Sequence, residues 1–199
     1  MAAELLTGLI HELRATTATE GVAVLLGLAY VVLAARGSRW CWPAGAAGSL
    51  LLAVLAWRAH LPMQALLNAW YVLMSVYGWV HWSQAQNDAI RRWPAGRHVL
   101  GIALSLAGAA VLAPWLAGVD AAWPRLDAAT TLLSLLATWL VARRVLENWL
   151  YWIAIDAVLV FLFAAQGLVF VALQFVVYLG IAVSGYLTWR RTWRAQTQS

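Results

Sequence analysis

Six stretches of this chain contain no Asp, Glu, Lys or Arg, and they constrain its fold more than any other feature. They cover 21–35, 40–57, 59–87, 98–119, 128–142 and 157–189. About 20 apolar residues span the hydrocarbon core of a bilayer, so most of these stretches fit one membrane helix. Open sheets cannot span lipid because their edges leave backbone groups unpaired, and a membrane barrel needs short alternating segments. We therefore expect an all-α polytopic membrane protein.

The composition agrees with a chain that has lipid as its main solvent. Hydrophobic residues make up 64% of the sequence and charged residues 11%, whereas soluble domains carry about 25% charge. The last charge-free stretch and the shorter one before Asp156 together hold two helices. This predicts seven transmembrane helices, at 18–36, 42–58, 62–82, 97–115, 128–143, 148–165 and 168–190. Residues 1–17 either form a short interfacial helix or fray, and no cleavable signal peptide is apparent.

The chain repeats itself at an offset of 107 residues. Residues 20–82 align without a gap on 127–189, and 17 of the 63 pairs are identical. The informative pairs are Trp42/Trp149, Tyr71/Tyr178, Gly78/Gly185, Trp82/Trp189 and Arg36/Arg143. Three helices in each copy would leave the copies antiparallel, but one intervening helix restores the same direction. We therefore predict two parallel three-helix bundles, 18–82 and 127–190, joined by a linker, 83–126, that contains the fourth helix, with a tail at 191–199.

Arginine predicts the orientation. All 13 basic residues are arginines, and seven helices place ten of them on one side, leaving Arg14, Arg58 and Arg125 on the other. Cytoplasmic loops carry the excess of positive charge, so we expect an inner-membrane protein of a bacterium with its N-terminus outside and its C-terminus in the cytoplasm. The lipid bilayer accounts for the net charge of +5, and no nucleic-acid partner is needed.

One helix carries the side chains best suited to a flat, cationic ring. Trp149, Trp152 and Asp156 are spaced i, i+3 and i+7, so they share a face of the helix predicted at 148–165. Indole faces attract cationic rings, and a carboxylate near mid-membrane is a functional candidate by default. Two structural alternatives remain: Trp149 lies in the interfacial aromatic belt, or Asp156 bonds a neighbouring hydroxyl.

Further polar groups occur on the helices at 62–82 and 168–190. Gln64, Asn68 and Tyr71 lie on one face of the first, and Gln174 and Tyr178 lie one turn apart on the second. Their amides offer both donors and acceptors to a substrate, and the two tyrosines are expected to meet across the axis that relates the repeats. The alternative is that the amides bond between helices and only hold the bundle together.

Gly78 and Gly185 each precede a tryptophan by four residues, Trp82 and Trp189, near the predicted cytoplasmic ends. We interpret these four residues as a gate or hinge, with close helix approach as the alternative. No catalytic constellation or metal-ligand spacing occurs, so we expect neither an enzyme nor a cofactor. A membrane receptor or scaffold that does not transport is the competing class, and proton coupling through Asp156 stays open.

Two motifs carry a family resemblance. The segment 147–152 reads Glu-Asn-Trp-Leu-Tyr-Trp, and 77–83 reads Tyr-Gly-Trp-Val-His-Trp-Ser. With the 3+1+3 plan, they resemble the PnuC family of vitamin transporters, which is similar in repeat plan to the SWEET sugar transporters. The resemblance implies uptake of nicotinamide riboside, an NAD precursor, by facilitated diffusion, with a cytoplasmic kinase trapping the vitamin. Thiamine and riboflavin are the alternatives, because Asp156 stands where some members carry Asn. The resemblance leaves open whether the chain forms a homo-oligomer.

Overall fold

The computed structural model describes residues 18–58, 62–84, 89–118 and 123–198. The predicted N-terminal segment, 1–17, lies outside these residues. The described part contains seven helices: α2 (Ala18–Ala35), α3 (Cys41–Arg58), α4 (Pro62–Trp82), α5 (Ala95–Ala117), α6 (Pro124–Ala142), α7 (Asn148–Ala165) and α8 (Val169–Gln198). The all-α prediction is confirmed, with one helix for each predicted span.

Two helix ends differ from the sequence-based bounds by more than two residues, both for local reasons. α6 begins at Pro124 rather than at 128, since proline is well tolerated in the first turn, where its missing N–H is not needed. α8 continues to Gln198 instead of ending near 190, so the predicted tail is mostly helical. Gln196 on this extension accepts a hydrogen bond from the backbone N–H of Ile90 (3.1 Å) through its Oε1, which ties α8 to the α4–α5 connection.

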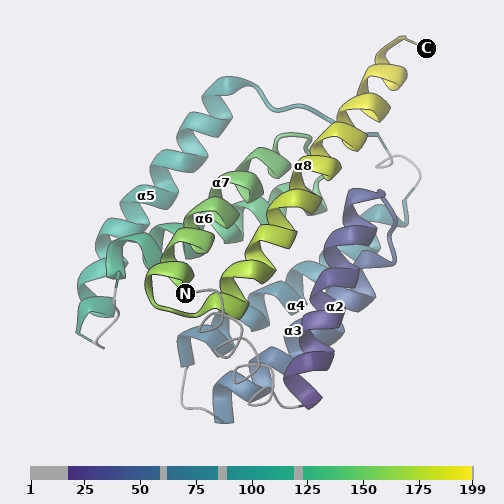
Figure 1. The fold of residues 1–199 in the computed structure, drawn as a ribbon. Helices are drawn as coiled ribbons and strands as arrows, with labels where there is room; N and C mark the ends of the chain where they lie inside the picture. The colour runs from purple at the N-terminus through teal and green to yellow at the C-terminus, as the bar shows by residue number, and fades with distance from the viewer. Residues whose placement is uncertain (1–17, 59–61, 85–88, 119–122, 199) are drawn as a thin grey trace.

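The helices form a closed ring. α2, α3 and α4 pack in chain order, as do α6, α7 and α8, and the two triplets meet where α2 contacts α8 and α4 contacts α6. α5 packs against α6 on the outside of the ring (Figure 1). The first helix of each triplet therefore contacts the third helix of the other, as a twofold relation between two parallel repeats requires.

Length and apolar composition alone are enough for four of the described helices, α5 to α8, to cross a membrane. α3 and α4, of 18 and 21 residues, are long enough as well at about 1.5 Å per residue. Small, aromatic and amide residues lower their mean hydropathy. Since α2 packs against α8 and α4 against α6, with α3 between α2 and α4, the chain is a multi-pass membrane protein.

The largest buried core lies at one end of the ring and is built around four tryptophans, which we call the tryptophan cluster: Trp42, Trp82, Trp149 and Trp189. Their ring centroids follow one another at 5.3 Å from Trp42 to Trp82, 5.9 Å from Trp82 to Trp189, and 5.6 Å from Trp189 to Trp149. All four belong to the repeat pairs recognised in the sequence. The repeats thus meet through equivalent side chains.

Each repeat also holds the other by a hydrogen bond at this end. The indole Nε1 of Trp82 donates to the carbonyl of Ala142 at the end of α6 (3.0 Å), and that of Trp189 donates to the carbonyl of Ala34 at the end of α2 (3.1 Å). The glycines make room for the cluster, because a Cβ at Gly185 would lie 2.8 Å from the ring of Trp149. A Cβ at Gly78 would likewise overlap the ring of Trp42.

The arginine-rich connections lie at the same end. Arg91 pairs with the α6–α7 turn, where its N–H donates to the Arg144 carbonyl (2.9 Å) and its carbonyl accepts from Leu146 (2.8 Å). Arg144 has a positive φ of 52° and places its guanidinium 4.0 Å above the ring of Trp82. Its repeat counterpart is Gly37, which also has a positive φ, 70°, so both repeats leave their first helix by a left-handed residue.

Candidate functional site

A cavity of about 390 Å³ lies inside the ring, and all six ring helices line it while α5 does not. One end of the cavity reaches Gln64 and Asp127, which are exposed, at the starts of α4 and α6. The other end reaches Ala34, Val141 and Trp149, which belong to the core around the tryptophan cluster. The cavity is therefore open at one end and closed at the arginine-rich end.

Most of the residues predicted to bind substrate meet in this cavity. They are Gln64, Tyr71, Trp149, Trp152, Asp156, Gln174 and Tyr178. Asn68 does not line it: its side chain is buried, and its Nδ2 donates to the carbonyl of Gln64 one turn earlier on α4 (2.9 Å). Thus three helices far apart in sequence, α4, α7 and α8, bring predicted residues together.

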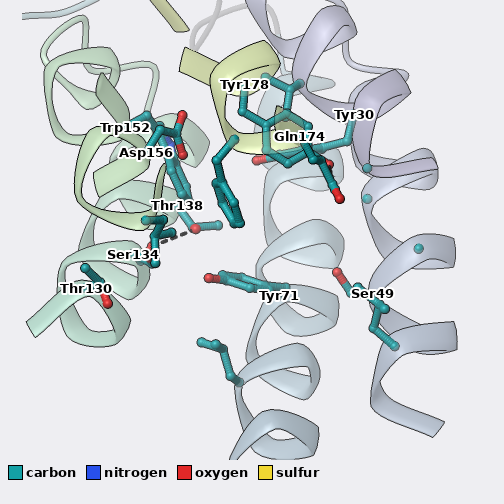
Figure 2. Close-up of a pocket in the computed structure, with 18 of the residues that line it drawn as sticks. Tyr30, Ser49, Tyr71, Thr130, Ser134, Thr138, Trp152, Asp156, Gln174 and Tyr178 are labelled. Carbon is teal, nitrogen blue, oxygen red and sulfur yellow. Dashed lines mark hydrogen bonds between the residues drawn. The ribbon is translucent and has the colours of Figure 1, made fainter. Parts of the chain in front are cut away.

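Asp156 is nearly completely buried, with 4% of its surface exposed. Figure 2 shows its side chain next to Trp152, on the side of the cavity opposite Tyr30. Within the described residues, no hydrogen bond or ion pair is formed by its carboxyl, and no arginine or histidine lines the cavity. The alternative interpretation, a structural bond to a neighbouring hydroxyl, therefore has no support in this structure.

The two tryptophans of α7 differ in what they do. Trp149 is 2% exposed and packs edge-on against Trp189, so it forms the floor of the cavity. Trp152, one turn away, is half-buried and presents its ring to the open volume. Trp152 is therefore the ring that faces the cavity, and Trp149 closes the cavity at its arginine-rich end.

The two repeats contribute unequal chemistry to an otherwise similar frame. The repeat counterparts of Trp152 and Asp156 are Gly45 and Ser49, and both line the cavity from α3. Tyr30 of α2 fills the space beside Gly45, where a Cβ would lie 2.8 Å from its ring. One wall thus presents Trp152 and a carboxyl, and the facing wall presents Tyr30 and a hydroxyl.

Tyr30 is a cavity residue that the sequence analysis missed. Its hydroxyl is buried and has no hydrogen-bond partner among the described residues, so it is available to a ligand. Its counterpart in the second repeat is Ala137, so the repeat alignment does not mark Tyr30 as a matched residue. The available signal was that Tyr30 is the single aromatic residue of α2.

Tyr71 and Tyr178 were expected to meet across the axis that relates the repeats, but no ring contact joins them in the described residues. Each reaches instead to the first helix of the opposite repeat. The hydroxyl of Tyr71 points toward Ser134 of α6 in Figure 2. The Tyr178 hydroxyl lies over Gly27 of α2 and accepts a hydrogen bond from Gln174 (3.0 Å). Gly27 and Ser134 are themselves repeat counterparts, so the two tyrosines make equivalent crossings.

Hydroxyl groups of α6 add polar edges to the same wall. Thr130, Thr131, Ser134 and Thr138 all line the cavity. Thr138 donates to the Ser134 carbonyl (2.8 Å), and Thr130 donates to the Leu126 carbonyl (2.9 Å). Both hydroxyls are therefore hydrogen-bonded to the backbone of their own helix. In the described residues, no cluster of three or more His, Cys, Asp or Glu side chains could hold a metal ion.

The family model for the nicotinamide mononucleotide transporter matches residues 17–191. The chain belongs to this family. The match covers both repeats and the linker helix, which is the region that forms the ring and its cavity.

Similar proteins are named as transporters of different vitamins. The nicotinamide riboside transporter PnuC of Escherichia coli is 24% identical over 200 residues, which cover 85% of this chain and 84% of that one. The riboflavin/roseoflavin transporter RibM of Streptomyces davaonensis is 28% identical over 177 residues, covering 84% and 82%. These relatives are transporters rather than enzymes.

A solved structure has the same fold. The crystal structure of the vitamin B3 transporter PnuC superposes with a TM-score of 0.74 at 22% identity, covering 98% of this chain and 92% of that one. The predictions of a polytopic helical fold and of a PnuC-type vitamin transporter are confirmed. The family members differ in the vitamin named, so the substrate has to be argued from the cavity.

Proposed function

We propose that this protein carries nicotinamide riboside across the bacterial inner membrane by facilitated diffusion. The observation that supports this best is the pairing of Trp152 with the unpartnered, buried Asp156 in one cavity wall. The pyridinium of nicotinamide riboside is flat and positively charged, so an indole face and a carboxyl attract it together. Its carboxamide and ribose hydroxyls match the amide of Gln174 and the hydroxyls of Tyr30 and Ser49.

The charge of the cavity favours a nucleoside over its phosphorylated form. The carboxyl groups that line the cavity are those of Asp127 and Asp156, and its described lining includes no arginine. A phosphate would meet these carboxylates without a basic partner, and burying an unpaired charge is costly. The neutral ring system of riboflavin would gain nothing from Asp156, whereas the thiazolium of thiamine would, so thiamine is the closest competitor.

The closed end of the cavity is where we place the cytoplasmic gate. The excess of arginine lies at this end, and the positive-inside rule assigns it to the cytoplasm, with the N-terminus outside. The open end, at Gln64 and Asp127, then admits the vitamin from outside. Inward release requires the two triplets to separate at Trp82 and Trp189, which breaks the hydrogen bonds that hold each repeat to the other.

No chemical step by this protein is needed for net uptake. Once the vitamin reaches the cytoplasm, phosphorylation by a kinase would add negative charge, and the acidic cavity would then reject the product. The gradient of the free vitamin is thereby maintained, and transport continues downhill. A functional link to such a kinase is therefore part of the proposal.

Thermal stabilisation of the purified protein tests the choice of vitamin. A ligand present at 100 times its dissociation constant stabilises the folded state by about 2.7 kcal/mol. We expect nicotinamide riboside to raise the melting temperature most, thiamine to act more weakly, and riboflavin and the mononucleotide to have little effect. Equal or greater stabilisation by riboflavin would contradict the assignment.

The single cysteine offers a test of the gate. Cys41 is fully buried beside the tryptophan cluster, so a thiol reagent reaches it only when that end opens. Trp189→Phe removes the bond to Ala34, and one hydrogen bond contributes about 1 kcal/mol. We expect maleimide to label Cys41 about fivefold faster in this variant. Trp57→Phe, at an exposed position on α3, is the control and should label at the wild-type rate. Identical rates in all three proteins would remove these tryptophans from the gate.

A further inference from the structure

A second hollow lies on the outside of the ring, between α5, α6 and α7, and we call it the outer groove. Its volume is about 510 Å³, and its walls are apolar along most of their length, with Ile102 on α5, Leu133 on α6 and Val158 on α7. Ile102 and Leu150, which both line the groove, are 38% and 46% exposed. The groove therefore opens sideways, toward the lipid that surrounds the ring.

The polar groups of the outer groove gather at one end. His98, Glu147 and Tyr151 lie near the starts of α5 and α7, which is the arginine-rich end. Val158 follows Glu147 by 11 residues, or about 16 Å along a helix at 1.5 Å per residue. The hydrocarbon core of a bilayer is about 30 Å thick, so one leaflet is about 15 Å deep. The groove thus runs from the surface of one leaflet to the midplane, which is the reach of one acyl chain.

One positive charge at the polar end has no counter-charge. Glu147 accepts a hydrogen bond from Nε of Arg92 (2.7 Å) and another from the backbone N–H of Trp93 (3.3 Å), so its carboxylate is already paired. Arg97, next to His98 on α5, places its guanidinium 6.0 Å from the centroid of the Trp93 ring. Within the described residues Arg97 forms no ion pair. An anion at this end of the groove would therefore meet an uncompensated arginine.

His98 adds a hydrogen-bonding atom without a partner. Its Nδ1 lies 3.0 Å from the hydroxyl of Tyr151, and when that hydroxyl donates, the ring carries its hydrogen on Nε2. Nε2 has no hydrogen-bond partner in the described part of the chain, since the oxygen of Glu147 beside it is 3.8 Å away. A phosphate or ester oxygen could accept the hydrogen bond that Nε2 offers.

We propose that the outer groove binds an anionic phospholipid of the leaflet at the arginine-rich end. One acyl chain fills the apolar length of the groove, and the phosphate lies at the polar end beside Arg97 and His98. Basic pockets between membrane helices are known to hold anionic headgroups in this way. A zwitterionic choline lipid fits less well, because it brings a cation of its own to the unpaired arginine.

Charge favours a lipid over a second copy of this chain as the occupant. An identical chain in the same bilayer has its arginine-rich end at the same depth, so it would bring further positive charge to Arg97. The phosphate of an anionic lipid brings the opposite charge. Its acyl chain also follows the groove to the midplane without presenting any polar group to the apolar walls.

The outer groove and the central cavity share one wall. Thr130 of α6 lines both, and Ile155 in the groove directly precedes Asp156 in the cavity. A bound acyl chain therefore packs against the back of the wall that carries this carboxyl, and it joins α5 to α7 as well as to α6. The site does not depend on which vitamin is carried. We expect lipid bound there to stabilise the folded protein.

Native mass spectrometry and thermal melting of the delipidated protein in detergent test the lipid class. The probes are dioleoyl phosphatidylglycerol, the phosphatidylcholine with the same chains, and glycerol 3-phosphate, which has no chain. Phosphatidylglycerol should bind and raise the melting temperature, and phosphatidylcholine should bind about fivefold more weakly, as expected for one arginine near a membrane surface. Equal binding of the two lipids, or an equal effect of glycerol 3-phosphate, would overturn the proposal.

A bulky side chain inside the groove tests the place of the acyl chain. Ala154 lines the groove from an exposed position on α7, so Ala154→Phe fills the space without displacing the core. We expect it to lower the affinity for phosphatidylglycerol at least tenfold. Ala157→Phe is the control, because Ala157 is also exposed on α7 but lines neither the groove nor the cavity. Equal affinities in the two variants would show that the lipid does not bind in the groove.

The headgroup contact is tested by removing one charge. Arg97→Gln should lower the affinity for phosphatidylglycerol about fivefold and leave that for phosphatidylcholine unchanged. Arg190→Gln is the matched control, since Arg190 lies over the ring of Tyr186 at the same 6.0 Å but on α8, away from the groove. Should Ala154→Phe fail to fold, this pair decides, and equal phosphatidylglycerol affinity in both arginine variants would overturn the proposal. The same spectra report the oligomeric state: a loss of subunits in Ala154→Phe with lipid binding intact would assign the groove to a second copy instead.

Discussion

Replacement of Trp152 with alanine is expected to weaken the binding of nicotinamide riboside at least tenfold. The half-buried ring of Trp152 faces the cavity beside Asp156, so it offers an indole face to a ring that the carboxyl has attracted. A cation–π contact contributes about 0.5–2 kcal/mol, and the stacked apolar area adds to it. Tenfold corresponds to 1.4 kcal/mol. Equilibrium binding of the radiolabelled vitamin to purified protein measures the change.

Two further variants show whether the effect is specific to an aromatic face at this position. Trp152→Phe keeps a smaller ring and should lose only about two- to fivefold in affinity. Trp57→Ala removes a tryptophan of α3 that is 71% exposed and does not line the cavity, so the affinity should be unchanged. A folded Trp152→Ala protein with wild-type affinity would show that the vitamin does not stack on this ring.

The helical framework could be predicted because it follows from rules that act along the chain. Charge-free stretches of bilayer length place the helices, and the offset of 107 residues predicts which of them are equivalent. The pairs Trp42/Trp149 and Trp82/Trp189 stood out because tryptophan matches by chance are rare. In the structure all four meet in one cluster, so equivalent residues of the two repeats form the contact between them.

The cavity itself could be predicted only in part, because each helix has several polar residues and the sequence does not show how the helix is rotated. Gln64 and Asn68 are one turn apart on α4, yet Gln64 lines the cavity and Asn68 bonds its own backbone. Tyr30 was missed because its counterpart is an alanine. The asymmetry between Tyr30 on one wall and Trp152 on the other depends on which side chain fills the space beside Gly45, which is a property of the packed ring.

The close fit between Gly185 and Trp149 predicts a large loss of stability from a small change in sequence. A Cβ at Gly185 would lie 2.8–2.9 Å from three ring atoms of Trp149, which is itself 2% exposed and cannot move aside without disturbing Trp189. Overpacking of this kind costs about 1–3 kcal/mol. We therefore expect Gly185→Ala to lower the melting temperature, by about 2–4 °C per kcal/mol for a chain of this size.

Gly180 provides a matched control on the same helix. It lies five residues earlier in α8, and a Cβ there would have no atom within 4 Å. Gly180→Ala should leave the melting temperature unchanged or raise it, because alanine restricts the unfolded chain more than glycine does. The opposite repeat offers the same test at Gly78, where the added carbon would overlap the ring of Trp42. If Gly180→Ala and Gly185→Ala had the same melting temperature, Gly185 would not be required for the tryptophan cluster. The contact between the repeats at the closed end would then need another explanation.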